Sequence, residues 1–353
     1  MKKINIVYAY MCEPRFEIEV PGHDAVAVWT AVEEPDADVV VYHSGYSYDP
    51  GNASTNPSVC RMLYTYEPLT VYPGHFQKKF WAPFDYVLTW NETLLEQGGK
   101  FVRFPSLYYD FPFGAAHGIA GKPVCPENWK EKSKAICQVA GNKYSFIRSE
   151  LYSRRRKTAR WFSRHGKLDL DTYGVPPMPV PGYKGRSANK LETLSQYRYA
   201  LCFENDAHPL WSRGYVTEKI FDCFYAFSVP VYLGASDIEC HIPKDCFIDY
   251  RDFDSLKDLD QFLCAMSDET YAGYLRSIER FLKEYNAPDK HTCFRLYEIA
   301  LTLLSEGSAP APENEVFGFW QKASFIEKAG CVLMSSILPL YQKFRRARYA
   351  GMN

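Results

Sequence analysis

Residues 197–234 read YRYALCFENDAHPLWSRGYVTEKIFDCFYAFSVPVYLG, and this stretch sets the fold class of the chain. The apolar run at 199–203 predicts a buried strand, and the run at 229–233 predicts a second one. Between them, 217–227 has the apolar spacing of a helix, with Thr217 as a candidate N-cap. A strand, a helix and a strand in this order predict a βαβ unit in a parallel sheet.

The polar residues of this unit are expected at the carboxyl ends of its strands, where open α/β sheets bind ligands. Glu204 and Asn205 follow the first strand directly, which favours a ligand-binding role over a turn-capping one. The helix start offers free N–H groups to a phosphate, and Lys219 opposes the helix dipole unless an anion binds beside it. Glu218 could hold a ribose diol. A solvated Lys219, a Glu218 that only serves the dipole and a Tyr215 in the core remain open alternatives.

Composition limits the classes of protein that fit. The 353 residues exceed what one hydrophobic core usually holds, so two domains are expected. A net charge of -1 and a pI near 6.7 exclude the basic field of a general nucleic-acid-binding protein. The 11 cysteines include no C-x-x-C pair and match no zinc spacing, which favours buried, reduced thiols in a cytosolic protein.

The first residues, MKKINIVYAYM, could begin a signal peptide or a strand. The apolar run is short, it is interrupted by Asn5, and no small-residue cleavage site follows it. A first β-strand is therefore favoured. No segment of the sequence reaches the length of a membrane span.

Strands and helices alternate along the chain, which implies parallel sheets in two successive domains. Expected strands are 4–8, 39–42, 62–65, 86–88, 101–104, 135–140, 168–173, 199–203 and 229–233. Expected helices are 146–165, 191–196, 217–227, 256–266, 270–285, 292–304 and 332–349. A Pro- and Gly-rich stretch at 110–126 is interpreted as the linker between the domains.

Three motifs taken together resemble a known family. Residues 203–205 read FEN, residues 215–219 read YVTEK, and residues 229–231 read VPV. This order and spacing resemble the signature of the α-1,3/1,4-fucosyltransferase family, glycosyltransferase family 10. The resemblance extends from about residue 61 to the IDYRDF run at 248–253.

Two upstream segments add to this resemblance. Residues 64–68 read YTYEP and are similar to the family's Y-T-G-E element, whose glutamate is the proposed catalytic base; here that residue is Glu67. Residues 138–148 are similar to the segment that supplies a diphosphate-binding arginine, which corresponds to Arg148.

The chain departs from the family pattern at several places. The loop 206–214 is longer than expected, Tyr66 stands where glycine is usual, and VAGN at 139–142 replaces S-N-P. Trp211 in the long loop could contact a ligand or anchor the loop to the core. The C-x-x-C found near the end of animal members is absent, which favours a bacterial-type soluble member.

The resemblance implies a GT-B fold, an α/β architecture in which two Rossmann-like domains face each other across a cleft. Residues 1–118 would form the acceptor-binding N-terminal domain, and residues 119–306 would form the GDP-fucose-binding C-terminal domain. Residues 307–353 would be a helical tail that packs back on the N-terminal domain.

The resemblance also implies a reaction, the inverting α-1,3 (or α-1,3/1,4) transfer of L-fucose from GDP-β-L-fucose to a GlcNAc-containing or N-acetyllactosamine-type glycan. Glu67 would be the general base. Arg148 and Lys219 would stabilise the leaving GDP, so neither a cofactor nor an obligatory metal is expected. The expected donor-binding residues are Arg148, Glu204, Asn205, Tyr215, Thr217, Glu218 and Lys219.

Two other functions stay open: a related inverting transferase that uses another GDP-sugar, and a non-catalytic glycan-binding relative. The expected partners are GDP-fucose and an oligosaccharide or glycolipid acceptor, with no nucleic acid. Residues 333–348 mix apolar and basic side chains, which suits either peripheral contact with an anionic membrane or packing within the protein. The expected location is the cytoplasm, with or without such contact at the inner face of the membrane. His43 and His75 are expected to be structural.

Overall fold

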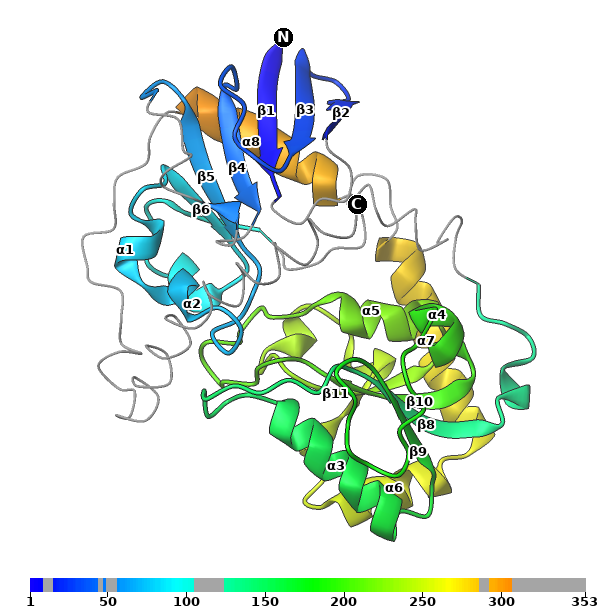
Figure 1. Cartoon of the computed structure of the whole chain (residues 1–353). Helices are drawn as coiled ribbons and strands as arrows, with labels where there is room; N and C mark the ends of the chain where they lie inside the picture. The colour runs from blue at the N-terminus through cyan, green and yellow to red at the C-terminus, as the bar shows by residue number, and fades with distance from the viewer. Residues whose placement is uncertain (9–14, 44–46, 49–55, 105–123, 286–291, 307–353) are drawn as a thin grey trace. The chain divides into compact units, whose positions relative to one another are not determined.

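The computed structural model describes residues 1–8, 15–43, 47–48, 56–104, 124–285 and 292–306, which form two compact units (Figure 1). Among these, the first unit holds the residues up to 104 together with Phe146–Arg148 and 292–306, and the second holds 124–145 and 149–285. Each unit is built on its own sheet, as the sequence predicts. The expected linker lies mostly outside the described residues, and the expected tail lies wholly outside them.

The first sheet is mainly parallel, in the order β2-β3-β1-β4-β5-β6-β7. Its central strands are almost entirely buried, which accounts for their continuous apolar sequence. The strands are β1 (Lys2–Val7), β2 (Arg15–Glu19), β3 (Ala25–Thr30), β4 (Val39–His43), β5 (Cys60–Thr65), β6 (Tyr86–Thr89) and β7 (Phe101–Arg103). The short helices of this unit are η2 (Pro73–Phe76), α1 (Lys78–Trp81) and α2 (Glu92–Leu95).

Two strands of this sheet, β2 and β3, were missing from the sequence prediction. They pair antiparallel, so the expectation of parallel strands throughout is wrong at this edge. β2 is an edge strand with alternating exposed and half-buried residues, and its charged RFEIE sequence hides it from a search for apolar runs. β3 lies between β2 and β1 and is nearly fully buried.

Helix α8 (Thr292–Glu306) corrects the predicted domain boundary at 306, because it belongs to the first unit. It packs along β1 and β4 (Figure 1). Trp29 Nε1 donates a hydrogen bond to Tyr297 Oη at 2.8 Å, and both residues are fully buried. Aromatic packing against the first sheet therefore outweighs the position of the helix in the sequence.

The second sheet is entirely parallel, in the order β12-β11-β10-β8-β9. Its strands are β8 (Lys134–Val139), β9 (Leu170–Tyr173), β10 (Tyr197–Phe203), β11 (Val229–Leu233) and β12 (Ile248–Asp249). Helices α3 and α6 cover one face, and α4, α5 and α7 cover the other (Figure 1). The helices are α3 (Tyr152–His165), α4 (Lys190–Ser195), α5 (Glu218–Tyr225), α6 (Leu256–Ala265) and α7 (Asp268–Tyr285).

The predicted βαβ unit is confirmed as β10, α5 and β11. The helix expected at 146–165 begins only at Tyr152, because the residues before it form an irregular turn. Single-turn helices complete the unit: η4 (Trp129–Glu131), η5 (Ile238–Cys240), η6 (Lys244–Cys246) and η7 (Tyr250–Asp252). Within the described part of the chain, no helix combines the length and apolar character needed to cross a membrane.

Replacing Trp29 with phenylalanine should lower the free energy of unfolding by roughly 1–3 kcal/mol, because the buried Tyr297 hydroxyl loses its indole donor. Urea denaturation followed by circular dichroism measures this loss. Tyr297→Phe is the matched variant, and the two losses should be less than additive in the double variant. Additive losses would show that α8 does not depend on this contact.

Candidate functional site

Helix α5 begins at the residue predicted as its N-cap. Thr217 has an extended backbone (φ -113°, ψ -177°), and its Oγ1 accepts a hydrogen bond from Lys219 N at 3.5 Å. Ile220, Phe221 and Phe224 are buried in the core of the second unit, which leaves the polar first turn at the carboxyl edge of the sheet. Local capping and apolar spacing together therefore position this turn.

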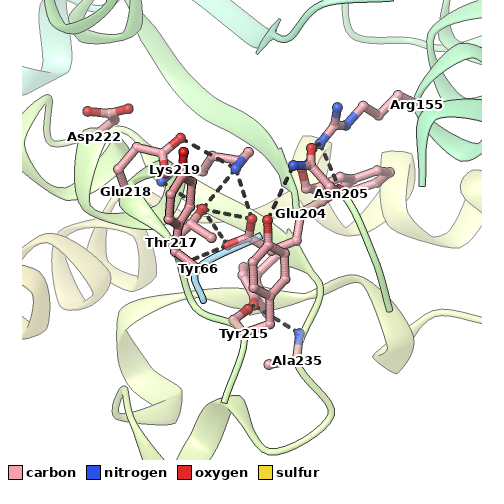
Figure 2. A network of polar contacts seen from close by, with 12 residues as sticks. Tyr66, Arg155, Glu204, Asn205, Tyr215, Thr217, Glu218, Lys219, Asp222 and Ala235 are labelled. Carbon is pink, nitrogen blue, oxygen red and sulfur yellow. Dashed lines mark hydrogen bonds and ion pairs between the residues drawn. The ribbon is translucent and has the colours of Figure 1, made fainter. Parts of the chain in front are cut away.

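A fully buried carboxylate joins the end of β10 to this turn. Glu204 follows β10 directly and is 0% exposed. Its Oε1 accepts from Thr217 N at 2.9 Å, and Thr217 Oγ1 lies 2.9 and 2.8 Å from its two oxygens. Lys219 Nζ lies 3.0 Å from Glu204 Oε2 and donates to Thr217 Oγ1 at 2.8 Å (Figure 2). Protein donors thus engage both oxygens of Glu204.

Lys219 lies beside two protein carboxylates, those of Glu204 and Glu218. These negative charges account for a lysine in the first turn, where the helix dipole disfavours a cation. Burial opposes its charged form, but the carboxylates of Glu204 and Glu218 more than compensate, so the pKa of Lys219 is raised. Burial likewise opposes the charge of Glu218, yet Lys219 and Lys190 lower the pKa of its carboxyl to about 2. Lys219 and Glu218 are therefore both charged at neutral pH.

Arg155 reaches the same strand end from α3. It is 3% exposed, and its Nη2 donates to Phe203 O at 2.5 Å, Glu204 O at 2.7 Å and Asn205 Oδ1 at 3.2 Å (Figure 2). Sequence reasoning missed this residue because it lies within a run of three arginines. The signal was its spacing from Tyr152 and Ala159, which places it on the buried face of α3.

Asn205 and Tyr215 complete the polar network. Asn205 Nδ2 donates to Tyr215 Oη at 3.2 Å, and Tyr215 is 2% exposed. Glycine is required nearby at 234, because a Cβ there would lie 2.5 Å from both Glu204 Cγ and Tyr232 Oη. The strand ends can approach each other closely only without that side chain.

The long loop 206–214 is folded onto the second unit. Trp211 is 5% exposed, which favours its role as an anchor of the loop. His208 Nδ1 accepts from the backbone N–H groups of Leu210 and Trp211, each at 3.1 Å, and Asp206 Oδ1 accepts from His208 N at 2.9 Å. Since Nδ1 accepts, His208 carries its proton on Nε2 in this conformation.

The two remaining predicted site residues belong to the first unit. Arg148 is an exposed turn residue before α3, in the short segment Phe146–Arg148 that groups with the first unit. Glu67 follows β5 in the first unit and is half-buried. Their functional roles stay predictions. Burial lowers the pKa of His43 and His75 to about 3, so both are neutral, as structural histidines would be.

A hollow opens beside Lys219 between the ends of β8 and β10 and the helices α4 and α5. It combines an apolar floor with the cationic side chains of Lys190 and Lys219, and its lining includes Val139, Ala140, Leu194, Cys202 and Phe203. Lys190 is ion-paired with Asp222. In the described part of the chain, no group of three or more His, Cys, Asp or Glu side chains could hold a metal ion.

Sequence comparison identifies the second unit. The family profile described as "Glycosyltransferase family 10 (fucosyltransferase) C-term" matches residues 129–295. This segment, somewhat less than half of the chain, is similar to glycosyltransferase family 10. The matched segment contains the Glu204 network, so the resemblance drawn from FEN and YVTEK is confirmed.

Curated relatives match about half of this chain. It is 32% identical over 169 residues to the 4-galactosyl-N-acetylglucosaminide 3-alpha-L-fucosyltransferase of Pan troglodytes, a match covering 46% of the chain and 42% of the relative. It is 34% identical over 169 residues to the 3-galactosyl-N-acetylglucosaminide 4-alpha-L-fucosyltransferase of Homo sapiens, with the same coverage, 46% and 42%. The chain therefore spans less than half the length of these relatives.

Two solved structures share the fold of this chain. An alpha1,3-fucosyltransferase with GDP gives a TM-score of 0.56 at 16% identity, covering 87% of this chain and 90% of that one. An alpha1,3-fucosyltransferase with GDP-fucose gives 0.53 at 18% identity, covering 89% and 93%. The predicted GT-B fold class is confirmed.

Replacing Glu204 with glutamine should lower the free energy of unfolding by roughly 3–5 kcal/mol, because Lys219 loses a buried counter-charge. Urea denaturation measures the change. Adding Lys219→Met should recover much of the loss, since the cation that lost its buried counter-charge is then absent. A Glu204→Gln variant as stable as the wild type would mean that the carboxylate does not hold the two elements together.

Proposed function

We propose that this chain is an inverting α-1,3 (or α-1,3/1,4)-fucosyltransferase that moves L-fucose from GDP-β-L-fucose to a hydroxyl of a GlcNAc-containing or N-acetyllactosamine-type glycan. The curated relatives are fucosyltransferases by name, and the two similar structures hold GDP and GDP-fucose. The observation that carries the proposal is the first turn of α5, where a cation and a capped helix start lie beside a hollow within the segment that matches the family.

This turn suits a nucleoside diphosphate. The α5 start presents backbone N–H groups and the positive end of a helix dipole, both of which favour an anion. Lys219 keeps its charge because Glu204 and Glu218 raise its pKa. Glu218 is half-exposed and ionised, so its carboxylate can accept hydrogen bonds from the vicinal hydroxyls of a ribose.

Inversion requires a single displacement, with the acceptor oxygen and the leaving diphosphate on opposite faces of the fucose C1. In the proposed step the new C1–O bond forms as the bond from C1 to the phosphate oxygen breaks, and that electron pair stays on GDP. Glu67 takes the proton of the acceptor hydroxyl, which is typically worth about 10²–10⁴ in rate. Lys219 and Arg148 stabilise the charge that develops on the diphosphate.

The same cations underlie the proposal that transfer needs no cofactor and no divalent metal. Two protein cations and a helix N-terminus supply the positive charge that a metal ion supplies in other nucleotide-sugar enzymes. A chelator should therefore leave the rate of fucose transfer unchanged in a continuous assay. Loss of activity on chelation, restored by Mg²⁺ or Mn²⁺, would contradict this part of the proposal.

The remaining proposals concern partners and location. An oligosaccharide or glycolipid is proposed as acceptor, and the cytoplasm as location. Peripheral contact with an anionic membrane through 333–348 also stays a proposal, since those residues lie outside the described ones. A transferase for another GDP-sugar and a non-catalytic glycan binder are the rival functions.

Transfer from labelled GDP-fucose to an array of acceptor glycans tests the proposal directly. The wild-type chain should label GlcNAc-containing acceptors, and Glu67→Gln should lower kcat by about 10²–10⁴ while GDP affinity measured by calorimetry stays the same. Glu96→Gln, an exposed glutamate in the same unit, is the matched control and should behave as the wild type. Binding of GDP-mannose in preference to GDP-fucose would favour the first rival, and glycan binding without transfer would favour the second.

A further inference from the structure

We propose that Arg155 is a positioning residue of the donor site, whose guanidinium fixes the orientation of Asn205 and, through it, of Tyr215. The inference deepens the proposed function and rests on it for the identity of the ligand. Its basis is that acceptors on three consecutive residues, 203–205, meet at one nitrogen of a single buried side chain.

Burial of this cation is unfavourable in itself. Burial lowers the pKa of Arg155, and its Nε is buried without a hydrogen-bond partner. An apolar side chain of similar size on the inner face of α3 would avoid both penalties. The favourable contacts of the guanidinium are concentrated on the end of β10 and on Asn205, which indicates a role at that strand end.

The hydrogen bond from Arg155 to Asn205 bears on which side of the Asn205 amide faces the guanidinium. The side-chain amide of asparagine presents an oxygen on one side and an NH₂ group on the other, and rotation by half a turn exchanges them. A guanidinium has only donors, so Arg155 selects the orientation in which Asn205 Oδ1 faces it. Nδ2 then faces Tyr215, whose hydroxyl oxygen accepts its hydrogen bond.

Without the guanidinium, Asn205 Oδ1 loses this donor, and in the flipped amide the Tyr215 hydroxyl could donate to Oδ1 instead. Arg155 thus favours the arrangement in which Asn205 Oδ1 and the Tyr215 hydroxyl accept and Asn205 Nδ2 donates, at the edge that would receive the diphosphate. Its positive charge also lies close to the carboxylate of Glu204, which partly offsets the effect of burial on its pKa.

Neither neighbouring arginine performs this task. Arg154 is exposed, with its guanidinium 6.0 Å from the centroid of the Tyr250 ring. Arg156 stacks 4.2 Å from the centroid of the Tyr144 ring and donates to Asn142 Oδ1 at 3.1 Å. Arg154→Met is therefore a matched control, because it removes the same charge from the adjacent position of the same helix.

Calorimetry and steady-state kinetics on the full chain separate positioning from a merely structural role. Arg155→Met should raise the Kd for GDP and the KM for GDP-fucose by about tenfold or more, with the KM for the acceptor unchanged. Arg155→Lys should recover part of the loss, because an ammonium can still donate to Asn205 Oδ1. A loss of thermal stability with GDP affinity unchanged would overturn the proposal, and so would an equal loss of GDP affinity in Arg154→Met.

A double-mutant cycle tests whether Arg155 affects GDP affinity through Asn205. If Arg155 acts by orienting the amide, Arg155→Met should add almost nothing to the loss of GDP affinity in Asn205→Ala. Additive losses would overturn the proposal. Arg155→Lys replaces Arg155→Met in the cycle if the methionine variant does not fold.

The side-chain amide of Asn205, observed by NMR without ligand, keeps the inference separate from the proposed function. Its two Nδ2 protons should be protected from exchange in the wild type and in Arg154→Met, and should exchange faster in Arg155→Lys. An unchanged amide signal would refute positioning even if the chain transfers fucose. A changed signal in a chain that binds no GDP would refute the proposed function and leave the positioning intact.

Discussion

A single buried carboxylate ties together the two elements on which the candidate site depends. Glu204 follows β10 directly and accepts hydrogen bonds from the backbone N–H and the hydroxyl of Thr217, the N-cap of α5. The same carboxylate pairs with Lys219. Because Glu204 is fully buried, this interaction is screened little by solvent and fixes the strand end, the helix start and the cation relative to one another.

The consequence for function is that the cation is preorganised. A lysine in a helix first turn is unfavourable to the helix dipole, and here two carboxylates hold it in place and keep it charged. An incoming diphosphate would meet a cation that is already oriented, so little reorganisation would be needed at the moment of reaction.

Sequence reasoning located this edge but could not assign its internal contacts. The order FEN and YVTEK was enough to predict the βαβ unit, the cap at Thr217 and the family. Glu204, which stays a predicted donor-binding residue, has both carboxylate oxygens engaged by Thr217 and Lys219. Such contacts arise only when the chain returns to the end of β10 at Thr217, 13 positions after Glu204, which no local pattern encodes. Arg155 was missed for a related reason, since its partners lie about 50 residues away.

In the first unit, prediction failed where tertiary contacts override local pattern. The edge strand β2 has too few apolar residues to be recognised. Helix α8 joins the first sheet through the contact of Trp29 and Tyr297, which are 268 positions apart in the sequence. Long apolar runs such as that of β4 were predicted because burial on both faces leaves a signal in the sequence itself.

Hydrogen–deuterium exchange of the full chain with and without GDP is the most direct test that this edge is a nucleotide site. GDP should slow the exchange of backbone amides at 204–205 and 215–220, the strand end and helix start that Glu204 joins, and UMP should do so much less. Protection that appears elsewhere in the chain while 215–220 exchanges at an unchanged rate would contradict that assignment.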